Sequence, residues 1–349
     1  MQFRLSIIPV SITFGVIILI FSILQNSLYQ YSKMLAKLNN GLSIPFIGLG
    51  TWKSKSNEVK SAVMAAISSG YRHIDCALEY DNEKYVGEGI NEMINKGLVS
   101  RNDLFITSKL WNSFHRPEDV LPSFKESLTR LNLSYIDLYL MHFPTGEDKS
   151  SKDFPDLSEE ERQVEKVDYV DTWRAMEALV EKGLCKSIGV SNFNEYQLER
   201  LLENSNIPPA VNQIEVHTYF TQTNLVNFCQ SKGVHVTAYS PLGSLDREEA
   251  TSDDPNILHD PTMEKLASQY KRTIPQIVFR SLIQRGLSVV PKSVTPQRIE
   301  CNINVFDFEL AQNDMKTISS LNKNWRALDL SWMDANHRYF PFKEGYSES

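Results

Sequence analysis

Four polar residues whose types fit proton chemistry follow apolar stretches in the first half of the chain. Asp75 comes directly after YRHI, Lys109 after FITS and His142 after DLYLM, and Tyr80 lies five residues beyond Asp75. A tyrosine has a pKa of about 10 and is a poor acid unless a nearby cation stabilises its phenolate. Lys109 could supply that cation, and Asp75 could keep a buried lysine charged. With His142 orienting a carbonyl oxygen, the four residues would deliver a proton to that oxygen while hydride reaches its carbon.

The elements that must position these residues alternate between strand-like and helix-like segments. We predict strands over 47–50, 71–75, 104–110, 136–143, 185–190, 211–216, 235–240 and 287–291. Helices are predicted over 57–69, 82–96, 117–131, 169–182, 194–204, 223–231, 262–270 with 274–284, and 296–302. Eight consecutive βα units favour an α/β fold of the closed (β/α)8 TIM barrel type, in which chemistry lies at the carboxyl ends of the strands.

Two further patterns support a barrel rather than an open doubly wound sheet. Segments such as DLYLMHF are apolar on both faces, which is typical of parallel strands covered by helices. An open sheet that binds a dinucleotide needs a glycine-rich turn after its first strand, and GLGTWK at 48–53 lacks the third glycine. Residues 37–47 precede the first unit and read as a β-hairpin, because Asn40-Gly41 fits the positive φ angles of a type I′ turn.

Composition and charge narrow the function classes. With 42% hydrophobic and 23% charged residues, the 349-residue chain can bury a sizeable core. A net charge of −7 argues against nucleic acid as the main partner. The four cysteines form no CxxC pair and the seven histidines no HxH or HExxH pattern, so we predict no metal.

The first part of the chain is apolar enough to interact with a membrane. Residues 5–24 carry no charge, and as a helix this run would span about 30 Å, roughly one hydrocarbon core. We expect an uncleaved anchor in residues 1–36, followed by a cytoplasmic catalytic domain over 37–349. A targeting peptide and an upstream start-site extension remain as alternatives. Orientation stays open, because Arg4 on one side is matched by Lys33 and Lys37 on the other.

Seven motifs carry a resemblance to a known family. IDCALEYDNE, ITSKLW, DLYLMHFP, GVSNF, VNQIEVH, AYSPLG and PKSVTPQRI are similar to the signatures of the aldo-keto reductases, in the family's order and spacing. The resemblance covers the chain from about residue 37 to the C-terminus. It implies NADPH-dependent reduction of aldehydes and ketones to alcohols, with Tyr80 as general acid, Lys109 and Asp75 tuning it, and His142 orienting the substrate.

The resemblance also implies a cofactor site for NADPH or NADP+ without a Rossmann domain. Ser191, Asn192 and Gln213 would hydrogen-bond the nicotinamide carboxamide, and the Tyr239 ring would stack on the nicotinamide. Ser240, Leu242 and Ser244 would border the pyrophosphate, and Asp246 would help to fold their loop over it. We expect the cofactor site also to include Gly50, Thr51, Trp52, Asp75 and Pro241.

The segment after the last predicted strand is suited to an anion. PKSVTPQR at 291–298 places two cations and two hydroxyls at the start of a predicted helix. The resemblance assigns Lys292, Ser293 and Arg298 to the adenosine 2′-phosphate, which favours NADPH over NADH, and we expect Val294 to belong to the cofactor site as well. Asn302 matches the family's adenine contact, but Cys301 stands where relatives often have a glutamate.

Aromatic residues beside the catalytic set predict the substrate site. Trp52, Trp111 and Phe143 with His142 would wall a pocket for a small-molecule carbonyl substrate, with core packing as the rival interpretation. The tail from Trp325 to Phe342 should cover that pocket. A catalytically weak NADPH-binding regulatory subunit on the same fold is the alternative function. We expect a monomer.

Overall fold

The computed structural model describes residues 34–147, 167–248, 250–331 and 333–342, and its centre is a sheet of eight parallel strands. The strands are hydrogen-bonded to one another in chain order. They are β3 (Leu49–Gly50), β4 (His73–Asp75), β5 (Phe105–Leu110), β6 (Ile136–Met141), β7 (Cys185–Ser191), β8 (Val211–Glu215), β9 (His235–Tyr239) and β10 (Ser288–Val289). All residues of β4, β5 and β6 are buried, as expected for parallel strands covered by helices.

The sheet closes on itself between its first and last strands. Ile47 forms a parallel bridge with Val289, and Gly50 forms one with Lys292. A glycine is required here, because a Cβ on Gly50 would lie 2.5 Å from the carbonyl oxygen of Val290. The closure confirms the expected (β/α)8 barrel. Strands β3, β4 and β10 are shorter than predicted, since only part of each predicted range pairs along the ladder.

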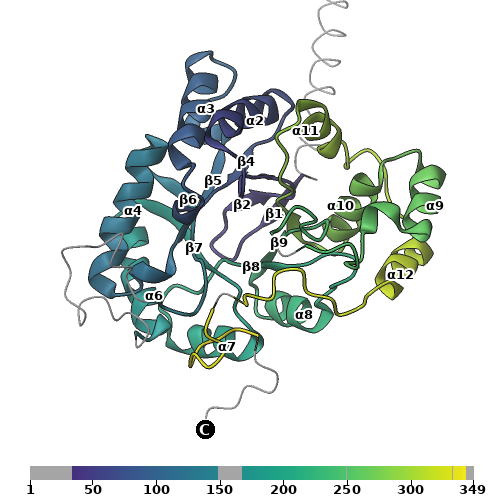
Figure 1. Ribbon diagram of the computed structural model, residues 1–349. Coiled ribbons are helices and arrows are strands. Elements are labelled where there is room, and N and C mark those ends of the chain that lie inside the picture. Colours follow the sequence, from purple (N-terminus) through teal and green to yellow (C-terminus); the bar gives the residue numbers. More distant parts are fainter. Residues whose placement is uncertain (1–33, 148–166, 249, 332, 343–349) are drawn as a thin grey trace, which may run out of the picture.

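Helices surround the strands on the outside of the barrel (Figure 1). Each predicted helix is present with its ends within one residue of the prediction: α2 (Ser56–Ser68), α3 (Glu83–Asn95), α4 (Pro117–Leu131), α6 (Tyr169–Glu181), α7 (Glu195–Asn204), α8 (Thr223–Ser231), α9 (Pro261–Tyr270), α10 (Ile274–Gln284) and α11 (Pro296–Asn302). The sequence did not predict α12 (Gln312–Ser320), in which Ile318 is the one buried residue.

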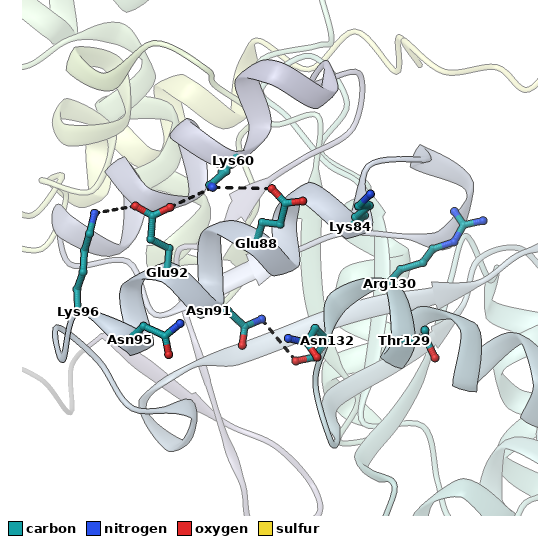
Figure 2. A pocket seen from close by; sticks show the side chains of 10 residues that line it. All are labelled: Lys60, Lys84, Glu88, Asn91, Glu92, Asn95, Lys96, Thr129, Arg130 and Asn132. Carbon is teal, nitrogen blue, oxygen red and sulfur yellow. Dashed lines mark hydrogen bonds and ion pairs between the residues drawn. The ribbon is translucent and has the colours of Figure 1, made fainter.

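A polar hollow lies on the outer surface over α2, α3 and α4 (Figure 2). Helices α3 and α4 approach closely there, because Gly87 in α3 leaves room for the carbonyl oxygen of Leu131 in α4, which would lie 2.3 Å from a Cβ. Glu92 pairs with Lys60 at 3.1 Å and with Lys96 at 2.8 Å. The residues that line this hollow include none of those expected to do chemistry, so we do not assign the active site to it.

The N-terminal hairpin is present, but its turn differs from the prediction. Strands β1 (Leu35–Lys37) and β2 (Ser43–Pro45) pair antiparallel. Within the Asn40-Gly41 pair only Gly41 has a positive φ, of 83°, so the predicted type I′ turn is wrong. Gly41 N donates to Leu38 O at 3.0 Å, and the loop ends on this left-handed glycine, which is the next most common hairpin geometry.

The hairpin covers the amino-terminal end of the barrel. Its Ile44 is fully buried and belongs to a cluster with Phe105, Leu138 and Val211, which come from three barrel strands. Asn40 Nδ2 also donates to Ser187 Oγ at 2.8 Å. The carboxyl ends of the strands therefore form the opposite end of the barrel, which we call the mouth.

Two sequence predictions concern features that the described residues test only in part. Among them, no helix is long and apolar enough to cross a membrane, and the apolar run 5–24 lies outside the described residues. Within the same ranges, no group of three or more histidine, cysteine, aspartate or glutamate side chains could hold a metal ion.

Candidate active site

Lys109 lies in β5 near the mouth, with 1% of its side chain exposed. Its ammonium donates to Asp75 Oδ1 at 2.6 Å, to the carbonyl oxygen of Cys76 at 3.0 Å and to the hydroxyl oxygen of Tyr80 at 3.3 Å. Asp75 ends β4, and Tyr80 ends the short 3-10 helix η1 (Leu78–Tyr80). Three of the four predicted catalytic residues therefore form one connected group.

The protonation states of this group follow from burial and charge. Burial alone would lower the pKa of Lys109, but the charge of Asp75 and the contact with Tyr80 outweigh it and raise that pKa above its usual value. Lys109 is therefore a permanent cation at neutral pH. Burial raises the pKa of Tyr80, and the charge of Lys109 opposes this only in part. Tyr80 thus keeps its proton, which a proton donor requires.

His142 follows β6 and lies beside Tyr80. Their ring centroids are 5.8 Å apart in an edge-to-face arrangement, and the His142 ring stacks on Phe143 at 5.0 Å. Burial, and then the charge of Lys109, hold the pKa of His142 well below its usual range. The imidazole is therefore neutral, with one nitrogen able to donate and the other able to accept. Among the described residues, its Nδ1 has no hydrogen-bond partner.

The catalytic group continues into the ends of β7 and β8. Gln213 Nε2 donates to Asp75 Oδ2 at 2.7 Å, and Ser191 Oγ donates to the Gln213 carbonyl oxygen at 2.8 Å. Asn192 Nδ2 donates to the His142 carbonyl oxygen at 3.0 Å. Three residues expected to hold the nicotinamide thus lie directly beside the residues expected to do the chemistry.

The backbone at the mouth includes left-handed conformations at residues other than glycine. Asn192 (φ 63°) comes directly after β7, and Ser240 (φ 46°) directly after β9. Such conformations are costly and concentrate at functional sites. Tyr239, the residue before Ser240, donates from its hydroxyl to Asn192 Oδ1 at 2.7 Å, and it is only partly buried. A partly covered aromatic ring beside amide and hydroxyl groups fits a nicotinamide ring and its carboxamide.

The residues expected near the cofactor phosphates lie in two loops that meet. Lys292 Nζ donates to Asp246 Oδ2 at 3.0 Å, which joins the loop after β9 to the loop after β10. Ser293 is buried and accepts from a backbone N–H through its Oγ. Arg298 and Asn302 lie on α11 and form no hydrogen bond or ion pair with the other predicted residues in the described part of the chain. The remaining members are buried Pro241 and partly buried Leu242, Ser244 and Val294.

Gly50 ends the first barrel strand, β3, and Thr51 and Trp52 follow it. Thr51 is buried, and its Oγ1 donates to the Asp75 carbonyl oxygen at 2.9 Å. Trp52 is partly buried, and the Lys53 ammonium lies 4.9 Å from its ring centroid. In the described residues, Trp52 makes no ring contact with the other aromatic residues of the expected substrate pocket.

Those other aromatic residues do form a wall. Trp111 lies 5.2 Å from His142 and 6.0 Å from Phe143, measured between ring centroids. Residues 325–342, which we call the tail, contain no helix or strand in their described part. The tail covers the wall, because Phe143 shares an apolar cluster with Leu330, Met333 and Phe340.

Two contacts at the mouth were not anticipated from the sequence. The Cys76 carbonyl oxygen is the third acceptor of the Lys109 ammonium. Glu215, at the end of β8, accepts hydrogen bonds from the backbone of the tail. The sequence signal for Glu215 was its position two residues after Gln213, which places both side chains on the same face of the strand.

Comparison with known proteins agrees with this geometry. The model of the Aldo/keto reductase family matches residues 46–323. The chain belongs to this family. Membership confirms the expected enzyme class, an NADP(H)-dependent oxidoreductase that acts on carbonyl groups.

The relatives match along almost their whole length. Aldo-keto reductase family 1 member A1 of Gallus gallus is 47% identical over 318 residues, which is 88% of this chain and 97% of the relative, and the Homo sapiens protein of the same name is 45% identical. An aldo-keto reductase of Bombyx mori, solved in complex with NADP, is 44% identical with a TM-score of 0.80 over 87% of this chain and 98% of that one. The aldose reductase of Schistosoma japonicum has a TM-score of 0.81 at 44% identity and covers 89% and 99%.

Proposed function

We propose that this enzyme reduces aldehydes and ketones with NADPH, and that Tyr80 gives the proton to the carbonyl oxygen. The observation that carries the proposal is the Lys109 ammonium, which donates to both Asp75 and Tyr80 while almost fully buried. As Tyr80 loses its proton, the fixed charge of Lys109 stabilises the phenolate without any rearrangement. The phenol then regains its proton from solvent before the next turnover.

His142 is assigned to orientation rather than to proton transfer. Its low pKa keeps the ring neutral, so it can donate a hydrogen bond to a carbonyl oxygen but does not carry a mobile proton at neutral pH. The Trp111 and Phe143 rings pack around it and fix the ring plane. A carbonyl oxygen placed between His142 and Tyr80 would accept from both.

The cofactor assignment follows the same geometry. NADPH, when bound, supplies the hydride. Ser191, Asn192 and Gln213 would hold the carboxamide, and Tyr239 would support the ring from the side away from the substrate. We assign the loop after β9 to the pyrophosphate and the loop after β10, with α11, to the 2′-phosphate and adenine: Ser240, Pro241, Leu242, Ser244, Asp246, Lys292, Ser293, Val294, Arg298 and Asn302.

The domain organisation is part of the proposal. We assign residues 37–349 to the catalytic barrel with its tail, to which β1 adds Leu35 and Ala36. The part of residues 1–36 that precedes β1 would act as a membrane anchor through the run 5–24. Alkaline carbonate extraction of membranes from cells that express the full chain tests this. Retention of the full chain and release of a chain lacking residues 1–33 are expected, and release of both would exclude an anchor. Sedimentation of the shortened chain should give a monomer.

The proposed reaction is tested by NADPH consumption. The purified chain should oxidise NADPH with a panel of reactive aromatic aldehydes, and NADPH binding should be detectable by calorimetry. Binding without turnover of any aldehyde would favour the alternative function, a regulatory subunit. Absence of binding would remove the proposal altogether.

A further inference from the structure

Glu215 is a buried carboxylate to which the proposed reaction assigns no role. It is the last residue of β8, and none of its surface is exposed. Its carboxylate accepts from Ala327 N at 2.6 Å and from Leu328 N at 3.0 Å, and it lies 2.9 Å from His217 Nε2. A carboxylate has two oxygens that can accept from two successive backbone N–H groups at once. Such charge-assisted bonds are stronger than neutral ones.

These two N–H groups belong to the beginning of the tail. Because the described part of the tail contains no helix or strand, its backbone groups depend on side chains and turns for partners. The other end of the tail is held by α7 and its N-cap. Gln197 Nε2 donates to Tyr339 O at 2.9 Å, and Asn194 Nδ2 donates to Pro341 O at 3.1 Å. Hydrogen bonds to side chains of the barrel domain therefore hold the tail at both of its ends.

The part of the tail between these two sets of hydrogen bonds forms one side of the apolar cluster over the mouth. Leu330, Met333 and Phe340 are each buried and cluster with Phe143, and Trp111 packs against the same cluster. These tail side chains can contact only the part of a substrate that extends beyond its carbonyl group. A shift of the tail would therefore change the binding of a large apolar substrate and leave a small one almost unaffected.

We propose that Glu215 is a positioning residue that holds the tail over the Trp111–Phe143 wall and so gives the enzyme its preference for carbonyl compounds with a large apolar group. The proposal rests on the proposed function, since it concerns the substrate of that same site. The Glu215 carboxylate contacts the tail and His217, and neither is among the donors and acceptors that we assign to the carbonyl and the cofactor.

The chain offers a matched control for the Glu215→Gln variant. Glu177 in α6 is also buried, and its Oε1 accepts from two successive N–H groups, those of Asn206 at 2.6 Å and Ile207 at 2.8 Å. That clamp holds the loop between α7 and β8, which enters the barrel at the amino end of β8. Glu177→Gln makes the same chemical change at the opposite end of the barrel.

Steady-state kinetics with two substrates test the proposal, with propanal as the small one and biphenyl-4-carbaldehyde as the large apolar one. Glu215→Gln should lower kcat/KM for the large aldehyde by about tenfold or more, mainly through KM, because one of two charge-assisted bonds is replaced. For propanal the change should stay below about threefold, as for a substitution away from the chemistry. Glu177→Gln should leave the ratio of the two kcat/KM values as in the native chain, whatever it does to thermal stability. An equal loss for both aldehydes in Glu215→Gln, or the same ratio in both variants, would overturn the proposal.

A second variant keeps the test decisive if Glu215→Gln folds poorly. Phe340→Ala removes the tail contact itself and should produce the same selective loss for the large aldehyde. The double variant should lose little more than either single variant, since both changes remove the same interaction. Additive losses would show that Glu215 acts by another route. Failure of the proposed function is distinguishable, because the native chain would then turn over neither aldehyde.

Discussion

Two clusters at opposite ends of the barrel use the same kinds of residues. At the mouth, Asp75 pairs with Lys109 beside Tyr80. At the amino end, Asp137 in β6 accepts from Arg101 at 2.7 Å and from Lys186 at 3.0 Å. The ring of Tyr135 lies between these two cations, with its centroid 3.9 Å from the Arg101 guanidinium carbon and 4.1 Å from the Lys186 ammonium.

The difference lies in burial and in the atom of tyrosine that meets the cation. Lys186 has 41% of its side chain exposed and faces the Tyr135 ring, whose hydroxyl donates to Asn102 Oδ1 at 3.1 Å. Lys109 has 1% exposed and donates to the Tyr80 hydroxyl itself. Water screens the first cluster, whereas a buried cation at the hydroxyl can stabilise a phenolate. The same residue types therefore form a proton donor only where the cation is buried at the hydroxyl. The same substitution made in each of the two clusters tests this difference.

The tyrosine pair should show the largest difference. Tyr80→Phe keeps the ring and removes the proposed proton donor, so kcat should fall by about 10²–10⁴-fold while NADPH affinity stays nearly unchanged. Tyr135→Phe should leave kcat within about twofold, because its hydroxyl is remote from the mouth. Substantial turnover in purified Tyr80→Phe, corrected for an empty-vector preparation, would mean that another group delivers the proton.

The two lysine variants should differ in kcat almost as much as the two tyrosine variants. Lys109→Met removes the charge that stabilises the phenolate and leaves Asp75 buried without its cation, so kcat should fall nearly as much as in Tyr80→Phe. Lys186→Met removes a partly exposed cation and should cost little activity, because screened ion pairs are weak. Stopped-flow measurement of NADPH oxidation in both variants provides the check. A near-native kcat in Lys109→Met would show that proton donation by Tyr80 does not depend on this cation.

The two clusters also show how far the sequence could predict the site. Asp75, Lys109 and His142 were found because each follows an apolar strand in a regular βα pattern, and a barrel brings all such positions to one end. The contact between Glu215 and the tail could not be predicted, since its partners are backbone groups 112 and 113 residues away. Helix α12 was not predicted either. It buries Ile318, with Met315 partly buried against the core, so its apolar stripe is too short to predict a helix.

We expect an effect of intermediate size from the two exposed cations that we assign to the 2′-phosphate. Lys292→Met and Arg298→Ala should each weaken NADPH far more than NADH, because only NADPH carries the 2′-phosphate. A charge-assisted contact of this type contributes about 1.5–3 kcal/mol, which corresponds to roughly 10- to 150-fold in Kd. Fluorescence titration with both cofactors measures the ratio. Equal losses for NADPH and NADH would show that neither residue recognises the phosphate.

The smallest effect concerns His73, which lies at the start of β4, two residues before Asp75. Its side chain is buried against Gly48, and burial is the main reason that its pKa is lowered to about 4. In the unfolded chain a histidine binds its proton below about pH 6.5. The unfolded state therefore binds more protons between pH 6.5 and 4, and His73 makes stability fall as pH falls through this window, by up to about 1.4 kcal/mol per pH unit. At pH above 6.5 both states are neutral at this position and His73 adds no pH dependence.

Thermal melts of the native chain and of His73→Asn between pH 7 and 5 test this linkage. The variant should have a lower Tm at pH 7, because the packing against Gly48 is lost, but its Tm should fall less on acidification, by a few °C over the window. His259→Asn is the matched control, since His259 is exposed and the same change there removes no buried imidazole. If the Tm values of the native chain and of His73→Asn fall in parallel on acidification, the acid sensitivity comes from other groups. Burial of His73 at the amino end of the barrel would then not make stability depend on pH.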